Sequence, residues 1–355
     1  MDQKYALYVG SFTDTNDCPG LTVFDADPVT ARLQKKEEIE VSNASYLAIS
    51  PDGRILYSLT DLGIISFRIL PDGSLQKINI RTIRGMRGCH ISTSRDGRYV
   101  FVSGFHDGKI TVLKTKPDGA VDGITDGVFH KGPGSVAERN FVPHVRCSRL
   151  TPDEKYLCSC DSGLDQVWIY RFDAAKGTLA SCDILRCPIQ SGPRHLLFTS
   201  DGRFMYLISE LSSQITVYSY EDGGDRPVFT QLQSVSTLGK HVNDYSAAVA
   251  LKLSEDENTL FCTNAGSHSV GVFRRDLESG LLTQLNVLPI SGRYPTEVVL
   301  FPDGKHLCCT NQDSDSLTTF HVNTENGLIV MCAAPIQVDQ PRCALMVKLP
   351  AEAEA

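Results

Sequence analysis

The hydrophobic residues of this chain fall into short apolar runs that polar turns separate at regular intervals. Near residue 200 the turn Asp201-Gly202 precedes the run Phe204–Ile208, and Gln214–Tyr220 then alternates apolar with polar side chains. Such alternation indicates a half-buried strand, and Asp-Gly between two runs favours a tight hairpin because glycine accepts positive φ values. A weaker run follows at Val228–Gln233. The local pattern therefore predicts a four-stranded antiparallel meander.

The turn phrase returns along the whole chain. Its six copies begin 44, 57, 48, 55 and 47 residues apart, at Ser50, Ser94, Thr151, Thr199, Ser254 and Phe301. A four-stranded unit that recurs every 40 to 60 residues or so is typical of a β-propeller blade. The expected inner strands are Tyr46–Ser50, His90–Ser94, Cys147–Thr151, His195–Thr199, Ala250–Ser254 and Glu297–Phe301.

The two ends of the chain together supply a seventh unit. Tyr5–Phe12 has the pattern of a second strand without a first, and Arg342–Lys348 has that of an inner strand without a following turn phrase. We therefore predict an all-β, seven-bladed β-propeller with four-stranded antiparallel blades. Strands from both termini close the ring in one blade, which removes free sheet edges. Residues 1–350 form one domain in this interpretation, and residues 351–355 form a disordered tail.

Composition narrows the possible partners and the compartment. The net charge of -8 argues against nucleic acid and anionic membranes as main partners. No apolar stretch approaches about 18 residues, and the first four residues lack the apolar region of a signal peptide. We therefore expect a cytoplasmic protein without a membrane partner, either a monomer or a weak homo-oligomer.

The twelve cysteines are expected to be reduced and to pack within strands. Most of them lie in strand-like runs, where a thiol serves as a small apolar residue. Cys158-Ser159-Cys160 and Cys308-Cys309 lack the spacing of paired zinc ligands and have no second pair at a set distance. The sequence therefore predicts no metal site.

Candidate functional residues should lie just before the inner strands, because these positions converge near the axis of a propeller. They are Tyr46, His90, His144 with Arg146, Arg194 with His195, Ser246, Thr296 and Arg342. Several histidines and arginines thus gather at one mouth of an otherwise acidic chain. This local positive charge suits an anionic substrate.

The densest cluster falls in the fifth blade, counted from the N-terminal one. Arg194 opens its inner strand and Glu210 follows its second strand, so antiparallel pairing brings the two side chains together. A structural ion pair at the rim of the sheet is the alternative interpretation. A neighbouring arginine also lowers the pKa of Glu210, which weakens it as a proton shuttle at neutral pH. His144 follows Gly119–Pro143, a long insertion rich in Gly and Asp, and long loops in compact domains are often functional.

At these residues the chain resembles the seven-bladed propeller lactonases, which include propeller-type 6-phosphogluconolactonases and fungal carboxy-muconate cyclases. The most specific matching segments are Gly192–Leu196 and Glu210–Ser213. Cys89–Ser92 and Asn311–Asp315 also match, and the likeness spans nearly the whole chain. The resemblance implies hydrolysis of a sugar lactone without metal or organic cofactor. The expected reaction converts 6-phosphogluconolactone to 6-phosphogluconate in carbohydrate metabolism.

The resemblance also implies a set of site residues. Arg194, Glu210 and a histidine at His144 match the catalytic residues proposed for the family, whereas this chain departs from it at Arg146, Ala250 and Thr296. We expect Arg194 to stabilise the oxyanion and Glu210 or His144 to position or deprotonate water. The residues expected to bind the substrate are His90, Arg146, His195 and Arg342.

Two rival functions stay open at this point. A muconate-type lactonising cyclase would form the lactone ester bond that a lactonase hydrolyses. A non-catalytic propeller would bind a ligand or protein. A closed polar pocket at the mouth would favour an enzyme, whereas a broad apolar surface would favour protein binding. A calcium-dependent propeller lactonase fits less well, because the expected inner ring is mainly His, Arg and aromatic rather than rich in carboxylates.

Overall fold

Side-chain hydrogen bonds fix the recurring turn phrase as a hairpin. In the five copies that begin with Ser or Thr, the hydroxyl donates to the Asp carboxylate two residues later. The same hydroxyl accepts the backbone N–H five residues later, as Ser50 does from Ile55 at 2.9 Å. Because these contacts satisfy the donors of a tight turn, the two flanking apolar runs are held in antiparallel register.

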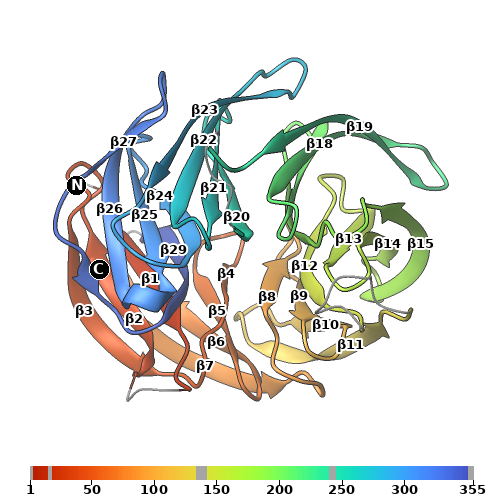
Figure 1. Cartoon of the computed structure of the whole chain (residues 1–355). Coiled ribbons are helices and arrows are strands. Elements are labelled where there is room, and N and C mark those ends of the chain that lie inside the picture. The colour runs from red at the N-terminus through yellow and green to blue at the C-terminus, as the bar shows by residue number, and fades with distance from the viewer. Residues whose placement is uncertain (1–2, 15–17, 133–141, 240–244, 351–355) are drawn as a thin grey trace.

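In the computed structural model, which describes residues 3–14, 18–132, 142–239 and 245–350, the hairpins assemble into seven sheets arranged in a ring (Figure 1). The inner strands, in order around the ring from the N-terminal blade, are β29 (Pro341–Lys348), β4 (Leu47–Ile49), β8 (His90–Thr93), β12 (Val145–Leu150), β16 (Pro193–Phe198), β20 (Ala248–Leu253) and β24 (Pro295–Leu300).

Three further strands complete each blade on the outside. The second strands are β1 (Tyr5–Ser11), β5 (Ile55–Thr60), β9 (Tyr99–Gly104), β13 (Tyr156–Asp161), β17 (Phe204–Ser209), β21 (Thr259–Asn264) and β25 (His306–Asn311). The third are β2 (Gly20–Ala26), β6 (Gly63–Ile69), β10 (Lys109–Thr115), β14 (Gln166–Asp173), β18 (Gln214–Asp222), β22 (Ser269–Arg275) and β26 (Ser316–Asn323). The outermost are β3 (Leu33–Glu40), β7 (Leu75–Thr82), β11 (Val121–Phe129), β15 (Thr178–Arg186), β19 (Pro227–Ser236), β23 (Leu282–Pro289) and β27 (Leu328–Met331). The seventh blade adds β28 (Ile336–Gln337) beside β26 and the 3₁₀ turn η1 (Gln312–Ser314).

Strands from both termini close the ring, which confirms the predicted fold class. In the first blade β29 pairs antiparallel with β1, and Tyr5 lies opposite Lys348. Figure 1 shows the two ends of the chain meeting in this blade, where the earliest and latest colours lie together. The predicted tail at residues 351–355 lies outside the described residues.

The hydrophobic core is divided among the junctions between blades. At the junction of the fourth and fifth blades, Tyr156, Cys158 and Cys160 pack against Leu196 and Leu207. Clusters of the same kind fill the other six junctions. Because each blade buries both faces against its neighbours, the second strands are buried along almost their entire length.

Two details differ from the sequence expectations. Four inner strands begin two residues earlier than predicted, at Val145, Pro193, Ala248 and Pro295. Residues 119–143 are not simply a loop, because Val121–Phe129 forms β11, the outermost strand of the third blade. No helix in the described part of the chain is long and apolar enough to span a membrane.

Candidate active site

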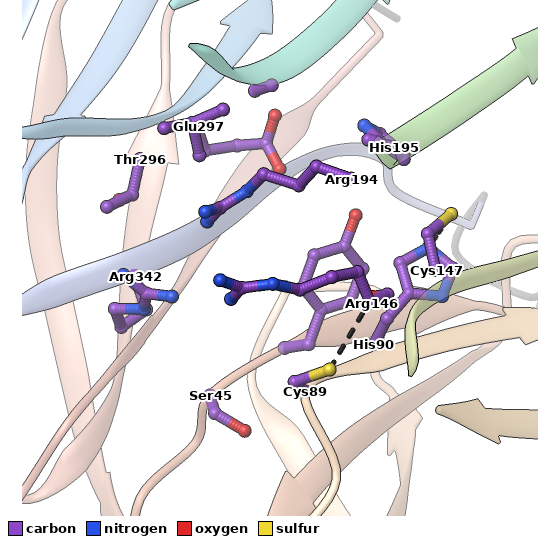
Figure 2. A pocket seen from close by; sticks show the side chains of 13 residues that line it. Ser45, Cys89, His90, Arg146, Cys147, Arg194, His195, Thr296, Glu297 and Arg342 are labelled. Atoms are coloured by element: carbon purple, nitrogen blue, oxygen red, sulfur yellow. Dashed lines mark hydrogen bonds between the residues drawn. The ribbon is translucent and has the colours of Figure 1, made fainter. Parts of the chain in front are cut away.

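The first residues of all seven inner strands, or those just before them, meet around a small cavity of about 60 Å³ (Figure 2). Its wall consists of Ser45, Tyr46, Cys89, His90, Arg146, Cys147, Arg194, His195, Val249, Ala250, Thr296, Glu297 and Arg342. All four predicted substrate-binding residues are in this set, together with Arg194. The wall is rich in charged and polar side chains, as in an enzyme pocket, and it is not a flat apolar surface.

β-bulges place the arginines in this wall. In the fourth blade Val145 pairs with Asp161 and Cys147 with Cys160, which leaves Arg146 as the extra residue between them. Arg194 and Arg342 occupy the same bulge position in their own blades. A bulge interrupts the alternation of a strand and re-aims the side chain at that point. In Figure 2, Arg146 and Arg194 extend side by side toward Arg342.

Glu210 connects two of these arginines. It directly follows β17, and its backbone N–H donates to the carbonyl of Gly192 at 2.7 Å. Its Oε2 atom lies 2.8 Å from Arg194 Nη1 and 2.9 Å from Arg146 Nη2. Burial acts to raise the pKa of Glu210, but the charges of Arg194 and Arg146 outweigh it and lower the pKa to about 2. The predicted contact between Arg194 and Glu210 is therefore present, and the carboxylate is ionised at neutral pH.

Arg342 gives the cavity its excess of positive charge. Its Nη1 donates to Gln312 Oε1 at 2.7 Å, and its guanidinium carbon lies 4.9 Å from the centre of the Phe12 ring. Burial, together with the like charge of Arg194, lowers the pKa of Arg342 to about 10. Three guanidinium groups thus line the cavity, and two of them pair with Glu210, which is not itself among the lining residues. This excess of positive charge attracts an anion at neutral pH.

His144 contributes to the site through Phe105. The two rings stack with their centres 4.1 Å apart, and His144 Nδ1 lies 2.8 Å from the Phe105 carbonyl oxygen. The Phe105 ring also contacts Arg146, whose guanidinium carbon lies 4.1 Å from the centre of the ring. His144 is not among the residues that line the cavity. The structure therefore places it one layer behind Arg146.

The contact between Phe105 and Arg146 leads to a first prediction. Replacing Phe105 with Leu removes the ring face that holds the guanidinium, so we expect kcat/KM for an anionic lactone to fall about three- to tenfold. Steady-state kinetics on the purified variant would measure this fall. The matched control is Phe129→Leu. Phe129 lies on β11, the outermost strand of the same blade, and its ring makes the same kind of cation–π contact, with Lys109. Equal activity of both variants and the wild-type protein would contradict a role for Phe105.

A second cluster of polar side chains lies around Cys147, in another part of the cavity wall. Cys147 Sγ is 3.4 Å from His90 Nε2, and Arg149 Nη2 donates to His195 Nε2 at 3.3 Å. Burial lowers the pKa of His90, which keeps its ring neutral at pH 7. Among the described residues, the side chains of His90, Cys147 and His195 bring potential metal-binding atoms within 4.8 Å of one another. Because they come from three blades, no local sequence motif could reveal this grouping.

Sequence reasoning missed two neighbours of the predicted residues, Phe105 and Glu297. Phe105 carried no signal, because it lies in the turn between β9 and β10. Glu297 lines the cavity, and burial raises its pKa, in contrast to that of Glu210. Tyr46 was named only by position, and its ring lies 4.6 Å from that of His90. Ala250 and Thr296, two of the three departures from the family pattern, also line the cavity, as does the third, Arg146.

Comparison with known proteins agrees with this architecture. The family model described as "Lactonase, 7-bladed beta-propeller" matches residues 6–346. A 6-phosphogluconolactonase of Bacillus subtilis is 27% identical over 305 residues, which cover 84% of this chain and 86% of the relative. A 6-phosphogluconolactonase of Formosa agariphila is also 27% identical, over 85% of this chain and 88% of the relative.

A solved structure extends the likeness to three dimensions. The periplasmic gluconolactonase of Pseudomonas aeruginosa superposes with a TM-score of 0.91 and 30% identity, over 98% of this chain and 100% of that one. The resemblance drawn from the sequence is thereby confirmed. The chain belongs to the family of seven-bladed β-propeller lactonases.

Proposed function

We propose that this protein hydrolyses a sugar lactone that carries an anionic group, namely 6-phosphogluconolactone, to the open-chain acid. The main support is the cavity itself, whose wall carries Arg146, Arg194 and Arg342. Two of these arginines, Arg146 and Arg194, also pair with the carboxylate of Glu210. Such a site has an excess of donors for a phosphate and for the negative charge that develops during ester cleavage. The names of the two curated relatives point to the same substrate.

In the proposed reaction a water molecule attacks the lactone carbonyl carbon. The guanidinium of Arg194 stabilises the oxyanion of the tetrahedral intermediate, and the ring C–O bond then breaks. One proton of the attacking water passes to the departing ring oxygen, which becomes a hydroxyl group. The other proton is released to the solvent as the former carbonyl carbon becomes a carboxylate. Arg146, Arg342, His90 and His195 bind the phosphate and the sugar hydroxyls. Arginine suits this role because its fork of N–H groups matches phosphate geometry.

In this scheme Glu210 orients the attacking water by a hydrogen bond and does not act as the general base that removes its proton. Both of its ion pairs involve Oε2. A carboxylate with a pKa of about 2 is a weak base, yet it still accepts a hydrogen bond from water. His144 acts through Phe105 on Arg146 and is a positioning residue in this proposal.

This assignment makes a prediction about pH. Because its partners lower the pKa of Glu210 from 4.5 to about 2, the ionised form persists throughout the range from pH 7 to pH 5. We therefore expect kcat/KM, corrected for spontaneous hydrolysis, to change by less than about twofold across this range. An acid limb with a midpoint near 6.5, the ordinary pKa of histidine, would show instead that a histidine is the base.

The substrate is tested by a comparison of three lactones. We expect kcat/KM for 6-phosphogluconolactone to exceed that for unphosphorylated gluconolactone by at least about tenfold, the ratio for one good charged hydrogen bond. Turnover of carboxymuconolactone alone would favour the muconate-type cyclase. No turnover of any of the three would favour a propeller that only binds a ligand.

We also propose that the protein acts in the cytoplasm. All twelve cysteines are free, which fits a reducing compartment. The periplasmic relative shows that the same fold also serves in another compartment. The oligomeric state stays as predicted, a monomer or a weak homo-oligomer, and the elution volume of the purified protein would measure it.

A further inference from the structure

The thiol of Cys147 lies in the wall of the cavity, surrounded by four side chains that can donate a hydrogen bond to it. His90 Nε2 is 3.4 Å from its Sγ atom, and His195, Arg149 and Cys160 also make side-chain contacts with it. Burial acts to raise the pKa of Cys147, but the contacts with Cys160 and the two histidines lower it well below the ordinary value of 9.0. These side chains can donate hydrogen bonds to the sulfur and would hold the negative charge of a thiolate when it forms.

The contact between Arg149 and His195 favours a thiolate over a bound metal. The guanidinium donates to His195 Nε2 at 3.3 Å, and guanidinium groups have no acceptor. His195 Nε2 is therefore the acceptor of this contact, and the ring proton of a neutral His195 lies on Nδ1. A cation bound at Nε2 would displace this contact and would bring a second positive charge beside Arg149.

Cys160 is placed to react with an oxidised Cys147. The two residues are direct partners across the antiparallel strands β12 and β13. Such partners have Cα atoms about 4.5–5.5 Å apart, within the range of about 4.4–6.8 Å that disulfides span. Burial and the neighbouring sulfur raise the pKa of Cys160, so it is the protonated member of the pair. Both sulfurs are free in the structure.

We propose that Cys147 is a modification site for hydroperoxides and that Cys160 resolves the product as a cross-strand disulfide. In the first step the Cys147 sulfur attacks one peroxide oxygen, the O–O bond breaks, and hydroxide leaves. The sulfur is oxidised to a sulfenic acid and the peroxide is reduced. In the second step the Cys160 sulfur attacks that of Cys147, the S–S bond forms, and the sulfenic oxygen leaves as water with the proton of the Cys160 thiol.

Mass spectrometry of the reduced full-length protein, treated with hydrogen peroxide at pH 7 and then alkylated, tests this proposal. Trypsin releases Cys147 in the fragment 147–149 and Cys160 in the fragment 156–171. We expect these two fragments to be joined by a disulfide, with Cys158 of the longer fragment still alkylated. In Cys160→Ser we expect a sulfenic acid at Cys147 that dimedone traps, because no resolving thiol remains.

Cys89 provides an internal control, because it lines the same cavity while burial raises its pKa to about 11. At pH 7 iodoacetamide should modify Cys147 at least about tenfold faster than Cys89, since the thiolate is the reactive form. Oxidation confined to Cys18, Cys182, Cys187 or Cys332, with Cys147 intact, would overturn the proposal. A stoichiometric metal ion in the purified protein, lost in Cys147→Ser, would also overturn it and identify a metal site instead.

Discussion

Replacing Arg194 with Ala should lower kcat for the lactone by about 10²–10³-fold while the melting temperature changes little. The large kinetic effect follows from the loss of a positioned donor to the oxyanion, whose removal has this typical magnitude. The small effect on stability follows from the geometry, because Glu210 keeps its 2.9 Å contact with Arg146 when Arg194 is absent. Steady-state kinetics and thermal unfolding of the same preparation would measure both quantities.

Arg275→Ala is the matched control for this variant. Arg275 also forms a buried ion pair, with Glu257 at 3.2 Å, and its Nε donates to the Tyr206 hydroxyl at 2.8 Å. It lies on β22 and does not line the cavity. We expect this variant to have a lower melting temperature than the wild-type protein and an unchanged kcat. If Arg194→Ala behaved in the same way, Arg194 would be a structural ion-pair partner and the proposed mechanism would fail.

Replacing Glu210 with Gln should reduce both stability and activity. The substitution leaves Arg146 and Arg194 without their shared counter-charge, in a site where the Glu210 side chain is only 10% exposed. Breaking a buried ion pair in this way costs about 3 kcal/mol or more of unfolding free energy. We expect urea unfolding to report this loss and inorganic phosphate to recover part of it, because the anion replaces the missing charge.

The pH dependence of this stability difference has a defined sign. The pKa of Glu210 is lowered in the folded protein, so its contribution is complete above about pH 4.5 and declines as the pH falls toward 2. Glu297→Gln is the control, because burial raises the pKa of Glu297 and its ionised form is disfavoured by folding. That variant should lose much less stability. Equal losses in the two variants would contradict the assigned role of Glu210.

The fold could be predicted from the sequence because its signals are local and repeated. Each turn phrase carries its own hydroxyl, carboxylate and glycine, and each apolar run carries the alternation of a strand. The ring closure followed from the same patterns at the two ends. Residues 119–143 were misjudged in part because β11 contains Gly123 and Gly127, which weaken the strand pattern. As an outermost strand it is held mainly by pairing with β10.

The site was predictable only where two neighbouring strands determine it. Arg194 and Glu210 lie at adjacent ends of β16 and β17, so antiparallel pairing alone brings them together. The contact of Arg146 with the same carboxylate depends on a bulge and on the packing of two blades, neither of which the local sequence encodes. The positions of Phe105 and Cys147 depend on the third and fourth blades meeting in the ring.

The most direct test of the proposed function is the rate of 6-phosphogluconolactone hydrolysis by the purified protein after treatment with a chelator. We expect clear acceleration over the spontaneous rate, unchanged by the chelator, since the proposed chemistry uses the arginines and Glu210. Acceleration that disappears with the chelator would show that a metal is required. No acceleration above the spontaneous rate, with or without the chelator, would contradict the assignment of this protein as a 6-phosphogluconolactonase.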